Sequence, residues 1–157
     1  MNIALLGYGK MGKVIEAIAL ERGHNIVLKV DADTTEFKLN NIDVAIDFSV
    51  PTAAVSNISK CLNKGIPVIS GTTGWLNQYQ EVVDLCHTTN GSFLYASNFS
   101  IGVNIFFEIN KRLSELMSGH VNYKANIEEI HHTQKLDAPS GTAITLAETI
   151  IKNSNYN

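Results

Sequence analysis

The sequence predicts an α/β protein whose N-terminal part is a doubly wound parallel sheet, followed by a smaller and partial α+β part. Over residues 1–98, short apolar runs alternate with longer stretches of helical periodicity, as strands and helices do in such sheets. A glycine-rich turn directly follows the first apolar run. After residue 98 the alternation stops, so we expect one domain over residues 1–98 and a second over residues 99–157.

Composition and charge exclude several classes of protein. Of the 157 residues, 45% are apolar, and the net charge is −3 without a run of Lys or Arg, which argues against disorder and against a nucleic-acid-binding surface. No apolar stretch approaches the ~18 residues that cross a bilayer, and the N-terminus lacks a basic signal-peptide region. We therefore predict a soluble cytoplasmic protein without a membrane partner. Cys61 and Cys86 are expected to be reduced thiols within helices, without a metal.

The first strand and helix are joined by the run Gly7-Tyr8-Gly9-Lys10-Met11-Gly12. Residues 2–6 form an apolar strand, and residues 11–22 carry a helical apolar stripe that ends at Gly23. In such a turn the first glycine permits the bend, the second lets the backbone approach a pyrophosphate, and the third lets the helix pack against the strand. The run therefore predicts a Rossmann-type dinucleotide-binding domain, with residues 7–12 contacting the cofactor.

The second strand is expected over residues 25–30, and Asp31 ends it. Asp31 lies about 20 residues after Gly12, where these domains place the acid that binds the adenosine ribose hydroxyls. A basic residue directly after this acid would favour a 2′-phosphate. None follows, and Asp33 adds like charge. We therefore predict that NADH is preferred, with NADPH as the alternative.

The remaining elements of the first domain alternate regularly. Residues 34–41 are expected to be a loop, so the usual second crossover helix is missing or very short. We predict strands over 42–48, 66–70 and 92–96 and helices over 52–63 and 76–88, the first of these helices burying Val55, Ile58, Ser59 and Leu62. Gly71-Thr72-Thr73-Gly74 follows a strand. Its small residues leave the backbone open to a flat cofactor ring whose amide the hydroxyls can bond, although an ordinary turn has the same composition.

The second domain carries the chemistry. We predict a helix over 101–117, a half-exposed strand over 121–127 and a helix over 140–152 with Ser140 as its N-cap. His131, His132 and Lys135 precede this helix and offer proton donors and a cation. The N–H groups of Ser140, Gly141 and Thr142 would be unpaired at the helix start, which binds anions. These features predict a small ligand that carries carboxylate or phosphate.

The run Glu129-Ile130-His131-His132-Thr133-Gln134-Lys135-Leu136-Asp137-Ala138-Pro139-Ser140-Gly141-Thr142-Ala143 resembles the signature of the 4-hydroxy-tetrahydrodipicolinate (dihydrodipicolinate) reductase family. Two turns are similar to cofactor-contacting turns of that family, namely Gly71 to Gly74 and Ala96-Ser97-Asn98-Phe99-Ser100. Thr133 and Gln134 occupy positions where the relatives often have basic residues. Fewer positive charges would therefore act on an anionic substrate.

The resemblance implies NAD(P)H-dependent reduction of 4-hydroxy-tetrahydrodipicolinate to tetrahydrodipicolinate in the diaminopimelate route to lysine. It implies that His131 and Lys135 are catalytic, with the choice of decisive proton donor left open between them. His132, Ser140, Gly141 and Thr142 would then hold the substrate. Residues 99–157 would be a substrate and catalytic domain, and family members assemble as homotetramers.

The predicted strand over residues 121–127 needs partner strands that these residues do not supply. Family members continue beyond this point, so we predict that the chain lacks their C-terminal part and that these residues alone need not be active.

Three alternatives remain open. A redox-sensing Rossmann regulator would bind cofactor without turnover. A semialdehyde or sugar dehydrogenase is another candidate. A semialdehyde dehydrogenase needs a catalytic cysteine at a helix start, and this is disfavoured because Cys61 and Cys86 are predicted to lie inside helices. A metal site at His131 and His132 is disfavoured, because neighbouring residues of a strand point to opposite faces.

Overall fold

The computed structural model describes residues 1–34, 36–131 and 138–154, so His132 and Lys135 lie outside the described residues. The chain divides into two compact units, Met1–Ala96 and Ser97–Asn157, which are described separately below. The division falls close to the predicted boundary after residue 98.

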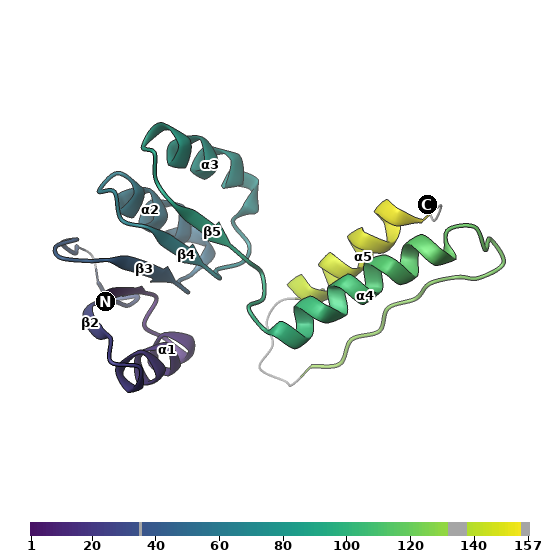
Figure 1. Ribbon diagram of the computed structural model, residues 1–157, viewed down its shortest axis with the longest axis horizontal. Coiled ribbons are helices and arrows are strands. Elements are labelled where there is room, and N and C mark those ends of the chain that lie inside the picture. Colours follow the sequence, from purple (N-terminus) through teal and green to yellow (C-terminus); the bar gives the residue numbers. More distant parts are fainter. Residues whose placement is uncertain (35, 132–137, 155–157) are drawn as a thin grey trace. The chain divides into compact units, whose positions relative to one another are not determined.

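The N-terminal unit is built on one parallel five-stranded sheet (Figure 1). Its strands are β1 (Asn2–Leu6), β2 (Asn25–Val30), β3 (Val44–Asp47), β4 (Val68–Ser70) and β5 (Phe93–Tyr95), in the spatial order β2-β1-β3-β4-β5. All five predicted strands are present, and the last three are shorter than predicted. The strand order reverses between β1 and β3. In open α/β sheets, ligands bind outside the carboxyl ends of the strands at such a point.

Helices cover both faces of this sheet, which confirms the doubly wound prediction. Figure 1 shows α1 (Lys10–Glu21) on one face and α2 (Pro51–Leu62) and α3 (Tyr79–Thr88) on the other. The predicted helix over 76–88 begins as a 3₁₀ turn, η1 (Leu76–Gln78). The segment between β2 and β3 has no helix in its described residues, so the missing crossover helix is also confirmed there.

The buried face of α2 differs from the prediction. The helix buries Ala54, Asn57, Ile58, Cys61 and Leu62, whereas Val55 and Ser59 are only partly buried. Ala54 and Cys61 have no exposed surface. The helix therefore packs against the core through small side chains as well as large ones. Apolar spacing alone favoured the larger residues and misplaced the stripe by part of a turn.

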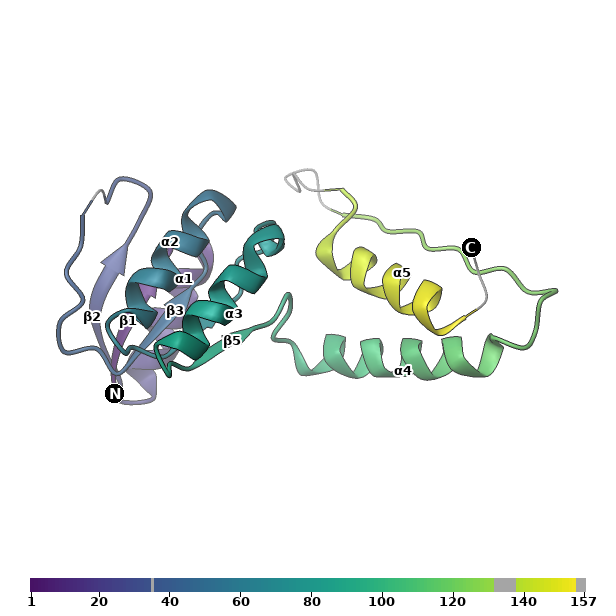
Figure 2. The same ribbon diagram turned by 90° about the horizontal axis from the view of Figure 1, so that it is seen from above.

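In the C-terminal unit, α4 (Ile101–Met117) and α5 (Gly141–Asn153) lie side by side (Figures 1 and 2). Both begin as predicted, because the hydroxyls of Ser100 and Ser140 accept hydrogen bonds from the backbone of each first turn. The strand predicted over residues 121–127 is wrong. That segment is irregular and exposed, because the described part of this unit offers no second strand to pair with its backbone.

The C-terminal unit buries little apolar surface. Of its described residues, only Ser114, Ser140 and Ala143 are buried. Apolar side chains along α4, such as Ile105 and Ile109, are more than half exposed. The two helices thus share a single seam rather than enclosing a core. Neither of them, nor any other helix in the described residues, is long and apolar enough to cross a membrane.

Candidate functional site

Of the three glycines in the turn after β1, Gly7 and Gly12 are required by the packing of the protein, whereas Gly9 is not. Gly7 has φ of +97°, and a Cβ there would lie 2.1 Å from the Phe48 carbonyl oxygen. A Cβ on Gly12 would lie 2.4 Å from the Gly7 carbonyl oxygen. A Cβ on Gly9 would meet nothing within 4 Å. Glycine at positions 7 and 12 therefore avoids clashes within the protein, whereas Gly9 leaves the backbone accessible to a ligand.

The turn is anchored to β2, and the start of α1 remains open. The backbone N–H groups of Gly7 and Tyr8 both donate to the carbonyl oxygen of Val30, at 2.8 and 2.9 Å. No side chain of the described residues caps the start of α1, where Gly9 is the N-cap residue. The first turn of α1 therefore presents backbone N–H groups and the positive end of the helix dipole to an anion.

The side chain of Tyr8 belongs to a polar cluster with Glu16 and Lys29. Its hydroxyl donates to Glu16, whose Oε1 lies 2.7 Å from Lys29 Nζ, and this ammonium also lies 4.7 Å from the centroid of the tyrosine ring. The bond from Lys29 lowers the pKa of Glu16. Both the Tyr8 hydroxyl and the Tyr8 backbone N–H are therefore already hydrogen-bonded within the N-terminal unit. Local sequence carried no signal for this cluster, because its members come from the turn, α1 and β2.

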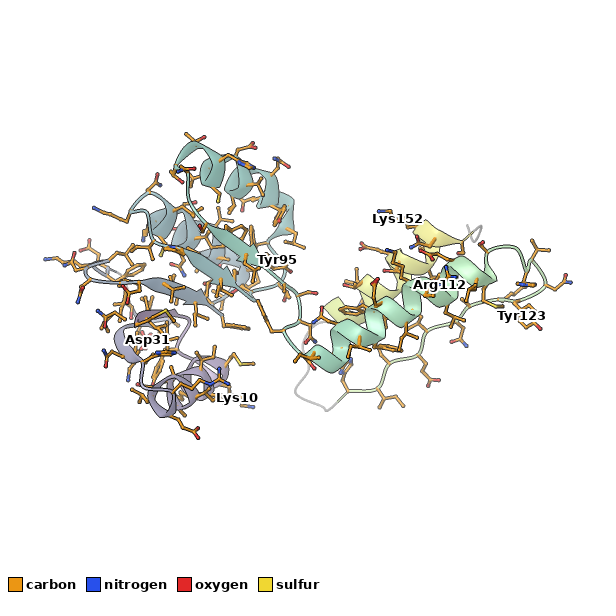
Figure 3. The ribbon with its side chains drawn as sticks, viewed as in Figure 1. Lys10, Asp31, Tyr95, Arg112, Tyr123 and Lys152 are labelled. Atoms are coloured by element: carbon orange, nitrogen blue, oxygen red, sulfur yellow. The ribbon has the colours of Figure 1, made fainter. Side chains whose placement is uncertain are left out.

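Asp31 directly follows β2 (Figure 3). It lines a cavity of about 850 Å³ that Gly7 and Gly9 also line. Its Oδ1 accepts hydrogen bonds from the Thr34 hydroxyl at 2.6 Å and from the Asp33 N–H at 3.2 Å. The Thr34 bond lowers the pKa of Asp31, so the carboxyl stays charged at neutral pH. The structure thus places Asp31, the residue predicted to bind the ribose, in the same cavity as the glycine turn.

The same cavity is lined by Phe37 and Lys60, which sequence reasoning did not select. Lys60 Nζ lies 4.8 Å from the centroid of the Phe37 ring, a cation–π contact between α2 and the loop before β3. Lys60 therefore brings a positive charge to a cavity whose other charged side chains are Asp31 and Asp33. The residues next to Asp31 in the sequence do not reveal it.

A buried carboxylate ties together the turns after β3 and β4. Asp47 has no exposed surface and accepts from the hydroxyls of Ser49, Ser70 and Thr72, at 2.7, 2.8 and 2.8 Å. The Thr72 oxygen also accepts from the N–H of Ser49 at 2.9 Å. The hydroxyl of Thr72, a predicted cofactor residue, is therefore already engaged inside the fold.

Aromatic packing holds the Gly71–Gly74 turn from the other side. The indole N–H of buried Trp75 donates to the Thr72 carbonyl oxygen at 2.7 Å. A Cβ on Gly71 would lie 2.3 Å from the Phe48 ring, so only glycine lets the two strand-end turns touch. Thr73 is exposed. Among the predicted residues of this turn, Thr73 is therefore the one whose hydroxyl faces solvent.

The predicted cofactor residues Ala96, Ser97, Asn98 and Phe99 span the division between the two units. The Ala96 N–H donates to the Ser70 carbonyl oxygen at 3.2 Å, which places Ala96 beside the end of β4. Asn98 belongs to the start of α4, where its Oδ1 accepts from the Ser100 N–H at 2.8 Å. Asn98 thus shapes the entry to that helix.

In the C-terminal unit, Glu129 joins His131 to the start of α5. Its Oε2 lies 2.8 Å from His131 Nε2, and its Oε1 accepts from the Ser140 N–H at 2.8 Å. The bonds from Ser140 and His131 lower the pKa of Glu129 to about 2. The prediction that the Ser140 N–H would be unpaired is therefore wrong. A carboxylate of the chain itself occupies it, since an anion is stable at a helix N-terminus.

Two backbone donors remain at this helix start. The Ser140 hydroxyl accepts from the Ala143 N–H at 3.0 Å and so serves as the predicted N-cap. Among the described residues, no acceptor pairs with the N–H groups of Gly141 or Thr142. Within the described part of the chain, these two N–H groups are therefore available to an anion. His132 and Lys135 fall outside the described residues, so only His131 of the three basic candidates can be placed.

Comparison with known proteins agrees with these two units. Residues 1–99 match the family model described as dihydrodipicolinate reductase, N-terminus, and residues 102–157 match the model described as dihydrodipicolinate reductase, C-terminus. A solved structure titled dipicolinate-bound dihydrodipicolinate reductase, from Paenisporosarcina sp. TG-14, has a TM-score of 0.69 and 24% identity. The alignment covers 100% of this chain and 68% of the chain of that protein, and it shows that the two share a fold.

Two curated relatives carry the name 4-hydroxy-tetrahydrodipicolinate reductase. The protein from Christiangramia forsetii is 56% identical over 157 residues, covering 99% of this chain and 66% of the relative. The protein from Alkaliphilus metalliredigens is 36% identical over 148 residues, covering 92% of this chain and 60% of the relative. The chain therefore spans about two thirds of the length of the curated relatives it matches.

Proposed function

The chain belongs to the dihydrodipicolinate reductase family, and we propose that its protein reduces 4-hydroxy-tetrahydrodipicolinate to tetrahydrodipicolinate with a nicotinamide cofactor, in the diaminopimelate route to lysine. The observation that carries the proposal is the Glu129–His131 pair at the N-terminus of α5. It combines a proton-carrying imidazole with an anion-binding helix end. The chain's other unit has the glycine turn of a dinucleotide-binding domain.

The residues of the N-terminal unit fit a dinucleotide. The open backbone at Gly9 and the uncapped start of α1 suit a pyrophosphate, and the charged Asp31 suits the ribose hydroxyls of the adenosine. The backbones of Gly71 to Thr73 and of Ala96 to Phe99 would line the nicotinamide. When bound, the reduced nicotinamide supplies a hydride. The chain's part is to hold the dinucleotide and orient it.

The C-terminal unit would hold the substrate and supply the proton. Loss of the 4-hydroxyl as water leaves a conjugated ring, and addition of a hydride to that ring builds negative charge, which one proton must neutralise. His131 is our first candidate for this donor, and Lys135 is the second. His132 and the N–H groups of Gly141 and Thr142 would bind the two carboxylates, with Ser140 holding the helix start in place.

We propose that NADH is the preferred cofactor, because Asp31 and Asp33 repel a 2′-phosphate at the rim of the cavity. Lys60 in the same cavity opposes this preference, so we expect NADPH to bind more weakly rather than not at all. We further propose a cytoplasmic homo-oligomer, which the family resemblance suggests. A comparison of the Michaelis constants for the two cofactors tests the preference, and a clear advantage for NADPH would contradict it.

The activity is tested by following NADH oxidation with freshly generated 4-hydroxy-tetrahydrodipicolinate. A protein of the relatives' full length should be assayed beside residues 1–157. We expect turnover by the long protein and NADH binding by both. Binding of NADH without turnover by the long protein would contradict the proposal and would favour a nicotinamide-responsive regulator.

A further inference from the structure

The two oxygens of the Glu129 carboxylate are hydrogen-bonded to different groups, one to a side chain and the other to a backbone N–H. One oxygen holds the His131 ring through Nε2, and the other holds the Ser140 backbone at the start of α5, each at 2.8 Å. All three residues belong to the same compact unit. A single side chain thus links the candidate proton donor rigidly to the end of the helix that would bind the substrate carboxylate.

We propose that Glu129 is a positioning residue that orients His131 so that Nδ1, rather than Nε2, faces the substrate and delivers the proton. An ionised carboxylate only accepts, so the hydrogen in its contact with His131 belongs to Nε2. This inference rests on the proposed reductase function. Glu129 itself touches neither substrate nor cofactor in this role.

The proton balance follows from this arrangement. The donor form of His131 carries hydrogen on both nitrogens, and Glu129 stabilises its charge. When the Nδ1–H bond breaks, the proton passes to the reduced ring, and the neutral imidazole keeps its Nε2–H bond to Glu129. The ring therefore stays in one tautomer and one orientation, as histidines held by a carboxylate do in other active sites.

Glu129 also decides which helix donors remain for the substrate. Because its Oε1 occupies the Ser140 N–H, the donors left for an incoming carboxylate in the described part of this helix start are the N–H groups of Gly141 and Thr142. The low pKa of Glu129 keeps it ionised and in place at neutral pH. The substrate is therefore expected one residue further along the helix start than an empty N-terminus would allow.

A kinetic comparison of Glu129→Gln with Glu128→Gln tests the proposal in the full-length protein. Glu128 is the adjacent, exposed carboxylate and serves as the matched control. We expect kcat to fall about 10–100-fold in Glu129→Gln, as for loss of an orienting partner. The substrate KM, the NADH affinity and the thermal unfolding temperature should stay close to wild type. An unchanged kcat, or a fall in kcat matched by loss of folding or of NADH binding, would overturn the proposal.

A spectroscopic measurement tests the tautomer without any turnover. Long-range ¹H–¹⁵N spectra of the imidazole rings, with the His131 signals assigned from a His131→Gln variant, identify the nitrogen that carries hydrogen in the neutral ring. We expect hydrogen on Nε2 in the wild type and a mixture of tautomers in Glu129→Gln. A wild-type ring with hydrogen on Nδ1 alone would refute the positioning role. If the wild type lacks reductase activity, the proposed function fails, and this spectrum still decides the orientation of His131.

Discussion

The hydroxyl of Thr72 donates a hydrogen bond of 2.8 Å to Oδ2 of Asp47 at the buried carboxyl edge of the sheet. This bond joins the turn after β4 to the end of β3, the neighbouring strand in the sheet. Phe48, the residue after Asp47, in turn limits what fits at Gly7 and Gly71. The turns after β1, β3 and β4 are therefore held together by one carboxylate and one aromatic residue.

Replacement of Asp47 by alanine should destabilise the N-terminal unit. Three hydroxyl groups would lose their common acceptor inside the fold, and a buried donor left without a partner costs about 1–3 kcal/mol. We expect the free energy of unfolding in urea to fall by at least that amount. Asp84→Ala is the control, because that carboxylate is exposed on α3. Equal stability of the two variants would show that the buried cluster contributes nothing.

Alanine at Gly9 and alanine at Gly12 should have different effects. The new Cβ at Gly12 would clash with the backbone of Gly7, so Gly12→Ala should lose stability, by about 1–3 kcal/mol for overpacking of this kind. The new Cβ at Gly9 meets no protein atom. Gly9→Ala should therefore unfold at the wild-type temperature yet bind NADH at least about tenfold more weakly, a loss of about 1.4 kcal/mol. Fluorescence titration and thermal unfolding separate the two outcomes; wild-type NADH affinity in Gly9→Ala would exclude a pyrophosphate at this turn.

Asp31→Asn should weaken NADH binding and reduce discrimination against NADPH. The variant removes the charge that accepts from the ribose hydroxyls and repels a 2′-phosphate, so we expect the NADH dissociation constant to rise about tenfold. The dissociation constant for NADPH should change less. Asp84→Asn provides the matched control. If both constants rose equally, Asp31 would not be the residue that distinguishes the cofactors.

His131→Gln and Lys135→Ala should each reduce kcat by about 10²–10⁴-fold or more, the usual effect of removing a general acid. NADH binding should be unchanged, since the dinucleotide turn belongs to the other unit. His120→Gln and Lys111→Ala are matched controls on exposed residues of the same unit. Steady-state kinetics in the full-length protein provide the measurement, and wild-type turnover in either variant would remove that residue from the mechanism.

Cys61 should be unreactive in the folded protein and should make folding less stable in alkali. Burial raises the pKa of the Cys61 thiol to about 11 from an ordinary 9.0, with a smaller contribution from the Asp47 charge. The folded state therefore keeps this proton while the unfolded state loses it, so stability is complete below pH 9 and declines as pH rises towards 11. Urea unfolding across this range checks the decline against Cys61→Ala, which should lack it. A thiol reagent should modify the partly exposed Cys86 first, and faster reaction of Cys61 would contradict its burial.

The helices and the sheet strands could be predicted because they depend on local pattern. The five parallel strands, α4 and α5 follow apolar periodicity, and Ser140, the predicted N-cap, marks the start of α5 through a hydrogen bond that spans three residues. The same reasoning failed over residues 121–127. Alternation of apolar and polar residues is compatible with a strand, but a strand also needs a neighbour, and neighbours are not encoded in the segment itself.

By itself, the sequence determined the order of elements, the glycine turn at residues 7–12, the acid at Asp31 and the signature segment around His131. Each of these depends on steric or chemical demands within a few consecutive residues. Only the tertiary structure decided that Lys60 reaches the cavity of Asp31, that Asp47 takes up the Thr72 hydroxyl, and that Glu129 occupies the Ser140 N–H. The first two join residues far apart in the chain, and the third spans 11 residues. In each case the partner is decided by how the segments pack and not by the neighbouring sequence.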